Sequence, residues 1–174
     1  NLPLGDPRKP EPVVLGSVIG MSTVSHCNDL IDDAIAKGAK LVCGGKSTDT
    51  LMPATLLDNV TPDMRIYREE SFAPVKAIVR VKGVEEAIAC ANDNEYGLSA
   101  SVFGRDIARA YNVARKIDSG ICHVNGPTVH DEAQMPFGGV KGSGYGRFGG
   151  KAGINEFTEL RWITIQTTPR QYPF

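Results

Sequence analysis

The chain has 174 residues, of which 41% are hydrophobic and 22% are charged, a composition typical of a compact globular domain with a core of its own. Its 19 Lys and Arg against 20 Asp and Glu leave a formal net charge of -1, so no field-driven attraction to nucleic acid or to an anionic membrane is expected. No apolar run approaches the roughly 18 residues of a membrane-spanning helix, and the Pro-rich start lacks the pattern of a signal peptide. We therefore expect neither nucleic acid nor a membrane as a partner.

The first half of the chain predicts one helix and two strands after an irregular lead-in over residues 1–20. Apolar side chains recur at helical spacing in STVSHCNDLIDDAIAKGAK, with Ser22 as a candidate cap and Gly38 as the stop. The segments LVCGG and PATLLDNV, residues 41–45 and 53–60, are short strands that run into turns.

The second half alternates more regularly. We expect strands at 74–81, 97–104 and 121–125, and helices at 83–94 and 105–120. Connections this short predict parallel strands joined by right-handed crossovers, and hence an α/β fold. Ligands of such sheets usually bind beyond the carboxyl ends of the strands.

A glycine-rich loop over 126–150, a helix at about 151–157 and a strand over 160–166 complete the chain. Within the loop, Gly144, Gly146 and Gly149 spell G-x-G-x-x-G, a pattern of dinucleotide-binding turns. A working turn of that kind follows a strand directly, whereas Pro136 and two glycines leave no room for one here. We therefore interpret the loop as a structural one.

The four cysteines, Cys27, Cys43, Cys90 and Cys122, include no C-x-x-C pair. Disulfide scaffolds are shorter and denser in cysteine, and zinc sites need paired ligands at short spacing. The pattern predicts free thiols in a reducing cytosol, a cytoplasmic location and no metal site.

Read with its surroundings, the glycine loop carries a family signature. The sequence resembles the aldehyde dehydrogenase superfamily in five segments. Three are the runs PFGGVKGSGYGR, which begins the segment 136–166, REESFAPV at 68–75 and GICHVNG at 120–126; the other two are residues 85–106 and 4–19. The resemblance covers nearly the whole chain, with the motifs in the family's order. It implies an α/β fold: a parallel-sheet segment of the catalytic domain over residues 1–157, and an oligomerisation tail over 158–174.

The resemblance covers only the final third or so of the family's usual chain. The coenzyme domain, the general base and the nucleophilic cysteine would lie upstream, since none of the four cysteines follows the expected Gly-Gln-x. The family reaction proceeds through a thiohemiacetal, hydride transfer to NAD or NADP, and hydrolysis of a thioester. The resemblance thus implies no catalytic residue in this chain, which is expected to be inactive alone.

For the coenzyme, the resemblance points to Glu70 and Phe72. Glu70, the second Glu of the family's E-E-x-F, would accept hydrogen bonds from the nicotinamide ribose, and Phe72 would pack beside the nicotinamide. The alternative is a solvated acidic turn with Phe72 in the core. Ala73 replaces the family's usual Gly, a costly change if the position needs a positive φ.

For the aldehyde, the resemblance implies a channel. Phe137 would line it, and Thr128, Val129 and His130 would lie in the loop that shapes its mouth. His130 is a candidate acid or base because its ordinary pKa lies near neutrality, although a loop histidine is more often only solvated. Asn125 would pin backbone near the site.

The segment over 160–166 alternates like an edge strand, with Leu160, Trp162 and Thr164 on one face. In the resembled family this tail joins a sheet of the neighbouring subunit, which implies a homodimer or homotetramer. The alternative is pairing within the same domain.

Among the family's branches, the loop from His123 to Gly150 is most similar to enzymes that oxidise aromatic aldehydes such as salicylaldehyde, vanillin or benzaldehyde. One alternative is an acylating or semialdehyde dehydrogenase relative. Another is a non-catalytic chain that acts through dimerisation. Fold alone does not decide between these substrates.

Overall fold

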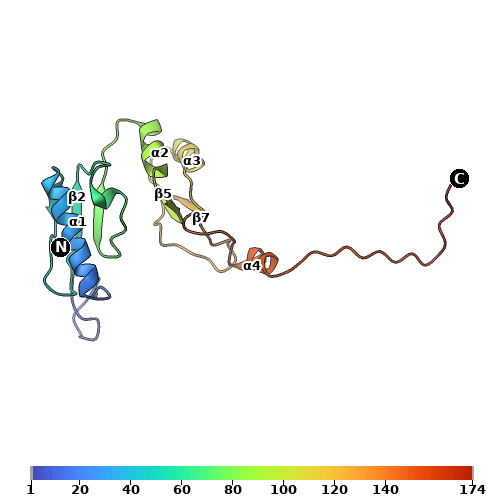
Figure 1. Ribbon diagram of the computed structural model, residues 1–174, viewed down its shortest axis with the longest axis horizontal. Helices are drawn as coiled ribbons and strands as arrows, with labels where there is room; N and C mark the ends of the chain where they lie inside the picture. Colours follow the sequence, from blue (N-terminus) through green and yellow to red (C-terminus); the bar gives the residue numbers. More distant parts are fainter. Residues whose placement is uncertain (1, 174) are drawn as a thin grey trace. The chain divides into compact units, whose positions relative to one another are not determined.

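A computed structural model describes residues 2–173. The chain forms two compact units that meet in sequence between Gly83 and Val84 (Figure 1). Unit 1 contains α1 (Met21–Ala36), β1 (Lys40–Cys43), β2 (Thr55–Asp58), the 3-10 turn η1 (Arg65–Tyr67) and β3 (Val75–Ile78). Unit 2 contains α2 (Val84–Asn92), β4 (Tyr96–Gly97), β5 (Ser99–Val102), α3 (Ile107–Ala114), β6 (Ile121–Val124), β7 (Val140–Lys141) and α4 (Gly150–Glu156).

Unit 1 is a three-stranded sheet in the order β1-β2-β3, covered by α1. β1 and β2 are antiparallel, whereas β2 and β3 are parallel, with Thr55 opposite Val75 and Asp58 opposite Ile78. The core is built from the apolar stripe of α1 and the inner face of the sheet: Val24, Cys27, Leu30, Ile31, Ala34, Met52, Leu57, Val60 and Val75. The helical spacing in the sequence is therefore confirmed as a core-facing stripe.

The ends of α1 confirm one predicted signal and correct another. Gly38 has a φ of +102° just past the helix, as expected of a glycine stop. The N-cap, however, is Gly20, and no side chain caps the first turn. The prediction of Ser22 as cap is wrong because the helix begins one residue before it, at Met21.

In unit 2, β5 and β6 are parallel and α3 connects them, which confirms the predicted crossover unit. Asp106 begins α3 as its N-cap, because its carboxylate accepts a hydrogen bond from the Arg109 amide at 3.0 Å. β4 pairs with β7 in an antiparallel ribbon. Helix α3 ends at Ala114, earlier than the predicted 120.

The expectation that the strands at 74–81, 97–104 and 121–125 form one parallel sheet is wrong. β3 belongs to the sheet of unit 1, and the predicted strand at 97–104 is divided into β4 and β5, which have different partners. At Gly97 an added Cβ would lie 2.5 Å from the Asp118 carbonyl oxygen and 2.7 Å from Val140 Cγ2. Gly97 thus leaves room for the Asp118 backbone and the Val140 side chain at the point where the strand changes partner, a close approach that an apolar pattern does not reveal.

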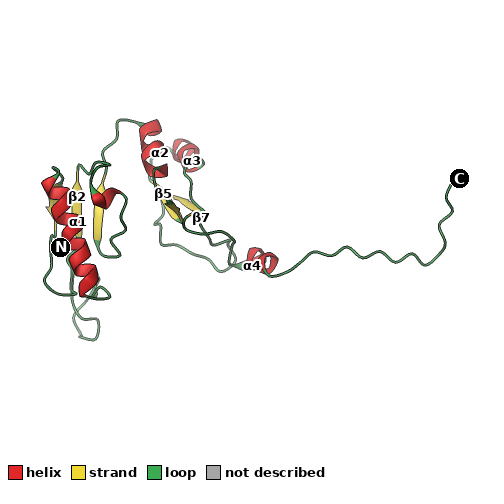
Figure 2. Cartoon of the chain, in the orientation of Figure 1, coloured by secondary structure: helices red, strands yellow, loops and turns green. Residues whose placement is uncertain are grey.

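Beyond α4 the chain has no helix or strand through residue 173, and Figure 2 shows this segment as loop throughout. Leu160 is 101% exposed and Trp162 is 90% exposed. The predicted strand over 160–166 therefore does not pair within its own unit, and its pairing with another subunit stays a prediction. A single strand without a partner has no ladder to satisfy its backbone groups. None of the helices in residues 2–173 is long and apolar enough to cross a membrane.

Candidate functional site

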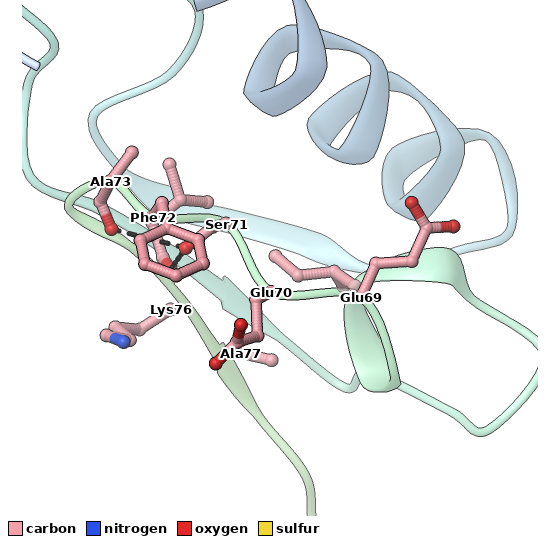
Figure 3. Close-up of a pocket in the computed structure, with 9 residues that line it drawn as sticks. Glu69, Glu70, Ser71, Phe72, Ala73, Lys76 and Ala77 are labelled. Atoms are coloured by element: carbon pink, nitrogen blue, oxygen red, sulfur yellow. Dashed lines mark hydrogen bonds between the residues drawn. The ribbon is translucent and has the colours of Figure 1, made fainter. Parts of the chain in front are cut away.

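A hollow of about 220 Å³ opens at the turn between η1 and β3 (Figure 3). Both residues predicted to contact a coenzyme line this hollow, Glu70 and Phe72. Its other lining residues are Ile66, Glu69, Ser71, Ala73, Val75, Lys76 and Ala77. The turn thus brings two carboxylates, those of Glu69 and Glu70, one ammonium and one aromatic ring to the same surface.

The two adjacent glutamates have different roles. Arg65 holds Glu69 with two hydrogen bonds, Nε to Oε1 at 2.8 Å and Nη2 to Oε2 at 2.9 Å. The hydrogen bonds from Arg65 hold the pKa of the Glu69 carboxyl below its usual value, and the charge of Arg65 adds to this. The Glu70 side chain points in another direction, toward the side of the turn that carries Lys76 and Ala77 (Figure 3). Glu70 is therefore the carboxylate that the turn presents away from Arg65.

Phe72 has a φ of +47°, in the left-handed region, and its side chain is 81% exposed. The alternative that Phe72 belongs to the core is therefore wrong. A left-handed non-glycine residue costs roughly 1–2 kcal/mol. An exposed aromatic ring held in a strained backbone conformation is typical of functional sites rather than of plain packing.

The strain at this turn does not fall on Ala73, the departure from the family motif. Ala73 does not have a positive φ, and its side chain is half-buried against the core of unit 1. Ser71 instead holds the turn from inside, since its Oγ lies 3.2 Å from the Ala73 carbonyl oxygen and 3.1 Å from that of Val75. The exchange of Gly for Ala therefore adds no backbone strain at residue 73.

A second hollow, of about 410 Å³, lies in unit 2 between β6 and the loop that follows it. Of the four residues predicted to shape an aldehyde channel, it brings together His130 and Phe137. Its remaining lining residues are Gly120, Ile121, Cys122, His123, Asp131, Glu132, Met135 and Pro136. Thr128 and Val129 do not line it: the Thr128 carbonyl accepts a hydrogen bond from Ser99 Oγ at 2.8 Å, and Val129 is 92% exposed.

Two histidine side chains, His123 and His130, meet in this second hollow. The rings of His123 and His130 meet edge to face with 5.4 Å between their centroids, and His130 Nε2 lies 3.5 Å from Glu132 Oε1. Within residues 2–173, the buried Nε2 of His123 has no hydrogen-bond partner. Burial raises the pKa of the Cys122 thiol, which keeps it protonated and a poor nucleophile. The sequence did not point to His123, because nothing along the strand indicates its pairing with His130.

Asn125 does pin backbone, as predicted. Its Oδ1 accepts from the Gly104 amide at 2.8 Å, and its Nδ2 donates to the Gly104 carbonyl at 2.9 Å. The Asn125 backbone has a φ of +56°, a conformation that asparagine adopts more readily than most residues. One side chain thus ties the end of β6 to the end of β5.

The glycine loop serves the fold rather than a nucleotide. An added Cβ at Gly149 would lie 2.2 Å from the Met135 carbonyl oxygen, and one at Gly150 would lie 2.6 Å from that of Gln134. One premise of our interpretation is wrong, since the two-residue strand β7 precedes the loop and α4 begins at Gly150. The backbone of 134–135 nevertheless packs directly against Gly149 and Gly150, and the Glu156 carboxylate lies beside Gly146, where it would repel a pyrophosphate, so we keep the structural interpretation.

A sequence profile described as "Aldehyde dehydrogenase family" matches residues 1–163. The chain belongs to this family. The matched residues include both the turn that carries Glu70 and the loop from Asn125 to Phe137.

Individual aldehyde dehydrogenases match over 91% to 100% of the chain. It is 58% identical to a vanillin dehydrogenase of Pseudomonas fluorescens over 99% of its residues and 36% of that protein. A crystal structure of a salicylaldehyde dehydrogenase from Pseudomonas putida G7, complexed with salicylaldehyde, superposes with a TM-score of 0.92 at 52% identity, over 100% of this chain and 36% of that one. An aldehyde dehydrogenase of Pseudomonas syringae in complex with NAD+ and octanal has a TM-score of 0.82 at 38% identity, over 91% of this chain and 33% of that one. The chain therefore spans about a third of the length of these relatives.

The sequence did not point to several residues that build the aldehyde dehydrogenase turn. Lys76 lines the hollow, Ser71 braces the turn, and His26 contacts the Glu70 carbonyl across 44 residues of sequence. No local spacing could have found the last contact, because the helix and the turn meet only through the tertiary fold. Within residues 2–173, no three His, Cys, Asp or Glu side chains gather to hold a metal ion.

Proposed function

We propose that this chain is the C-terminal part of the catalytic domain of a longer NAD(P)-dependent aldehyde dehydrogenase, here called the parent enzyme. The parent enzyme oxidises an aromatic aldehyde to the carboxylic acid through a cysteine thiohemiacetal and a thioester. Its nucleophile and general base lie upstream of Asn1. Residues 1–157 belong to the catalytic domain, residues 158–174 form the oligomerisation tail, and the parent enzyme is cytoplasmic.

The observation that carries the proposal is the hollow lined by Glu70 and Phe72. Both Glu69 and Glu70 line it, but Arg65 already binds the Glu69 carboxylate, so the Glu70 carboxylate is the acceptor that we assign to the ribose. A carboxylate has two acceptor oxygens, which suit the two adjacent hydroxyls of a ribose. When bound, the coenzyme accepts a hydride from the substrate; Glu70 holds the ribose, and the exposed Phe72 ring limits the motion of the nicotinamide.

The second hollow supports an aromatic substrate. Its volume of about 410 Å³ lies in the range of small-molecule sites, roughly 300–1,000 Å³. Phe137, Pro136, Met135 and Ile121 provide apolar surface, and His130 with Glu132 provides polar groups at one side. Such a lining accepts a flat ring that carries a polar substituent. The similarity to vanillin and salicylaldehyde dehydrogenases supports the same substrate class.

Two other functions would use the same turn or tail. An acylating or semialdehyde dehydrogenase would hand its acyl group to another carrier, and a non-catalytic chain would act only through dimerisation. The exposed Phe72 in its left-handed conformation favours a coenzyme-binding role over dimerisation alone. Backbone strain is retained mainly at binding and catalytic sites, and dimerisation through the tail does not require it at this turn.

The proposal is tested by exchanging Glu70 in the parent enzyme. Glu70→Gln keeps the shape but removes the charge that strengthens the hydrogen bonds from the ribose. We expect a coenzyme KM raised about ten-fold and slower hydride transfer, measured by stopped-flow formation of NADH or NADPH, since charge-assisted hydrogen bonds contribute about 1.5–3 kcal/mol.

Glu85→Gln is the matched control, because this exposed carboxylate pairs with Lys116 in unit 2 and lines neither hollow. Its coenzyme KM should stay within about two-fold of the wild type, the change typical of an exposed ion pair. Steady-state rates with salicylaldehyde, vanillin and benzaldehyde, each with NAD and NADP, identify the substrate and the coenzyme. Equal coenzyme KM values for wild type and Glu70→Gln would exclude Glu70 from the site.

A further inference from the structure

Helix α1 contacts the Glu70 turn from behind through two consecutive residues. His26 Nε2 lies 3.0 Å from the Glu70 carbonyl oxygen, and Cys27 Sγ donates to the Ser71 carbonyl oxygen at 3.1 Å. A carbonyl oxygen can only accept, so the hydrogen of the first contact belongs to Nε2. The helix therefore satisfies two successive carbonyl groups of the turn with side-chain donors.

These donors replace a backbone ladder that the turn lacks. Among residues 2–173, no backbone N–H donates to the Glu70 or the Ser71 carbonyl outside the helices and strands, and neither residue belongs to such an element. Burial raises the pKa of the Cys27 thiol, so it remains an S–H donor, although a weak one. The imidazole of His26 is thus the stronger of the two donors that α1 contributes.

The peptide between Glu70 and Ser71 lies between two anchors that do not hold it directly. On one side, the Glu69 amide donates to the Arg65 carbonyl at 2.9 Å and the Glu69 carboxylate pairs with Arg65. On the other, Ser71 Oγ contacts the Ala73 and Val75 carbonyls. Between them, strain at Phe72 favours rotation of the chain toward an unstrained conformation, which would move the Glu70 carboxylate. The contact from His26 opposes this rotation at the Glu70 carbonyl itself.

We propose that His26 is a positioning residue for coenzyme binding: its Nε2–H donates to the Glu70 carbonyl and fixes the orientation in which the Glu70 carboxylate faces the ribose. This inference rests on the proposed coenzyme role of Glu70. His26 touches neither coenzyme nor substrate and acts only through the turn.

The test compares two side chains of nearly equal shape in the parent enzyme. His26→Met removes the donor, whereas His26→Gln restores an N–H at a position comparable to Nε2. We expect His26→Met to raise the coenzyme KM about three- to ten-fold, the loss of one hydrogen bond, and His26→Gln to stay within about two-fold. The aldehyde KM should not change in either variant. Ser25→Ala, an exposed neighbour on α1, controls for the helix itself.

A double-mutant cycle with Glu70→Gln separates the inference from the proposed function. If His26 acts through Glu70, His26→Met has little further effect in the Glu70→Gln background. A full three- to ten-fold effect in that background would overturn the inference, as would equal coenzyme KM values for His26→Met and wild type. If Glu70→Gln itself binds coenzyme like the wild type, the proposed function has failed instead.

Two further measurements keep the test decisive. Thermal unfolding of each variant identifies loss of fold, and His26→Ala replaces His26→Met if the latter does not fold. Side-chain 15N spectra of the parent enzyme report the tautomer of His26 without use of activity. A protonated Nε2 at neutral pH supports the contact, and a neutral ring protonated only at Nδ1 would overturn it.

Discussion

Asn125 and Gly104 are joined by a pair of hydrogen bonds that run in opposite directions, from the Gly104 amide to Oδ1 at 2.8 Å and from Nδ2 to the Gly104 carbonyl at 2.9 Å. β5 and β6 are parallel and end side by side, and this pair closes their carboxyl ends. The loop that leaves Asn125 leads to His130 and Phe137. The position of the proposed aldehyde site in unit 2 therefore depends on this amide.

We predict that Asn125→Asp destabilises the chain by about 0.5–1.5 kcal/mol, because a carboxylate cannot donate to the Gly104 carbonyl and one exposed hydrogen bond is lost. Urea unfolding followed by circular dichroism measures the change. Asn125→Leu should cost more, since it also places a branched side chain at a φ of +56°. Asn125→Gly relieves the backbone and loses both hydrogen bonds, so it should fall between wild type and Asn125→Leu. An Asn125→Leu chain as stable as Asn125→Gly would show that the backbone conformation costs nothing.

The stability of unit 1 should depend on acid through Asp58. Its carboxylate is bound by Arg80, Nε to Oδ1 at 2.9 Å and Nη2 to Oδ2 at 2.6 Å, and these contacts hold its pKa below the usual value. A carboxyl whose pKa is lower in the folded than in the unfolded state stabilises the fold above its unfolded pKa, about 4. That stabilisation is lost as the pH falls through the lowered pKa.

Arg80→Met should therefore lower stability most at neutral pH, and the difference from wild type should shrink as the pH falls below about 4. Unfolding in urea at a series of pH values measures this. Arg8→Met is the control, because Arg8 pairs with Asp6 on the exposed lead-in and such pairs contribute little. A difference between Arg80→Met and wild type that is constant with pH would exclude the ion pair as its cause.

The 174-residue chain alone should show no dehydrogenase activity. None of its cysteines has the sequence context of the family nucleophile, and burial raises the pKa of both Cys27 and Cys122. Formation of NADH from NAD and an aromatic aldehyde, followed by absorbance with purified chain, is the measurement. Turnover above the rate of a heat-denatured sample would overturn the proposal that nucleophile and base lie upstream.

The tail should assemble the parent enzyme. Trp162 is 90% exposed and Leu160 is 101% exposed in the isolated chain, and an exposed apolar strand edge seeks a partner. Burial of a tryptophan stabilises an interface by a few kcal/mol, at about 25 cal/mol per Å². Trp162→Ala, or truncation after Thr158, should lower the oligomeric mass measured by light scattering from that of a homodimer or homotetramer. An unchanged mass of the truncated enzyme would mean that other surfaces hold the subunits together.

Local patterns in the sequence determined the parts of this protein that depend on neighbouring residues. The stripe from Val24 to Ala34 predicted α1 because helical spacing places those side chains on one face, and Gly38 predicted its end. The family motifs likewise led to Glu70 and Asn125, since each motif is a short contiguous run. The crossover from β5 through α3 to β6 followed from its short connections.

Only the tertiary structure decided which distant segments meet. β3 pairs with β2 rather than with the strand that follows it, and His26 reaches Glu70 across 44 residues. The tertiary structure also places the backbone strain at Phe72 rather than at Ala73. Ser71 holds this left-handed conformation through its own hydrogen bonds, and the contact from Cys27 on α1 to the Ser71 carbonyl lies next to it. A side-chain pattern reports which face is apolar, whereas partner and register are set by the packing of faces that are far apart in sequence.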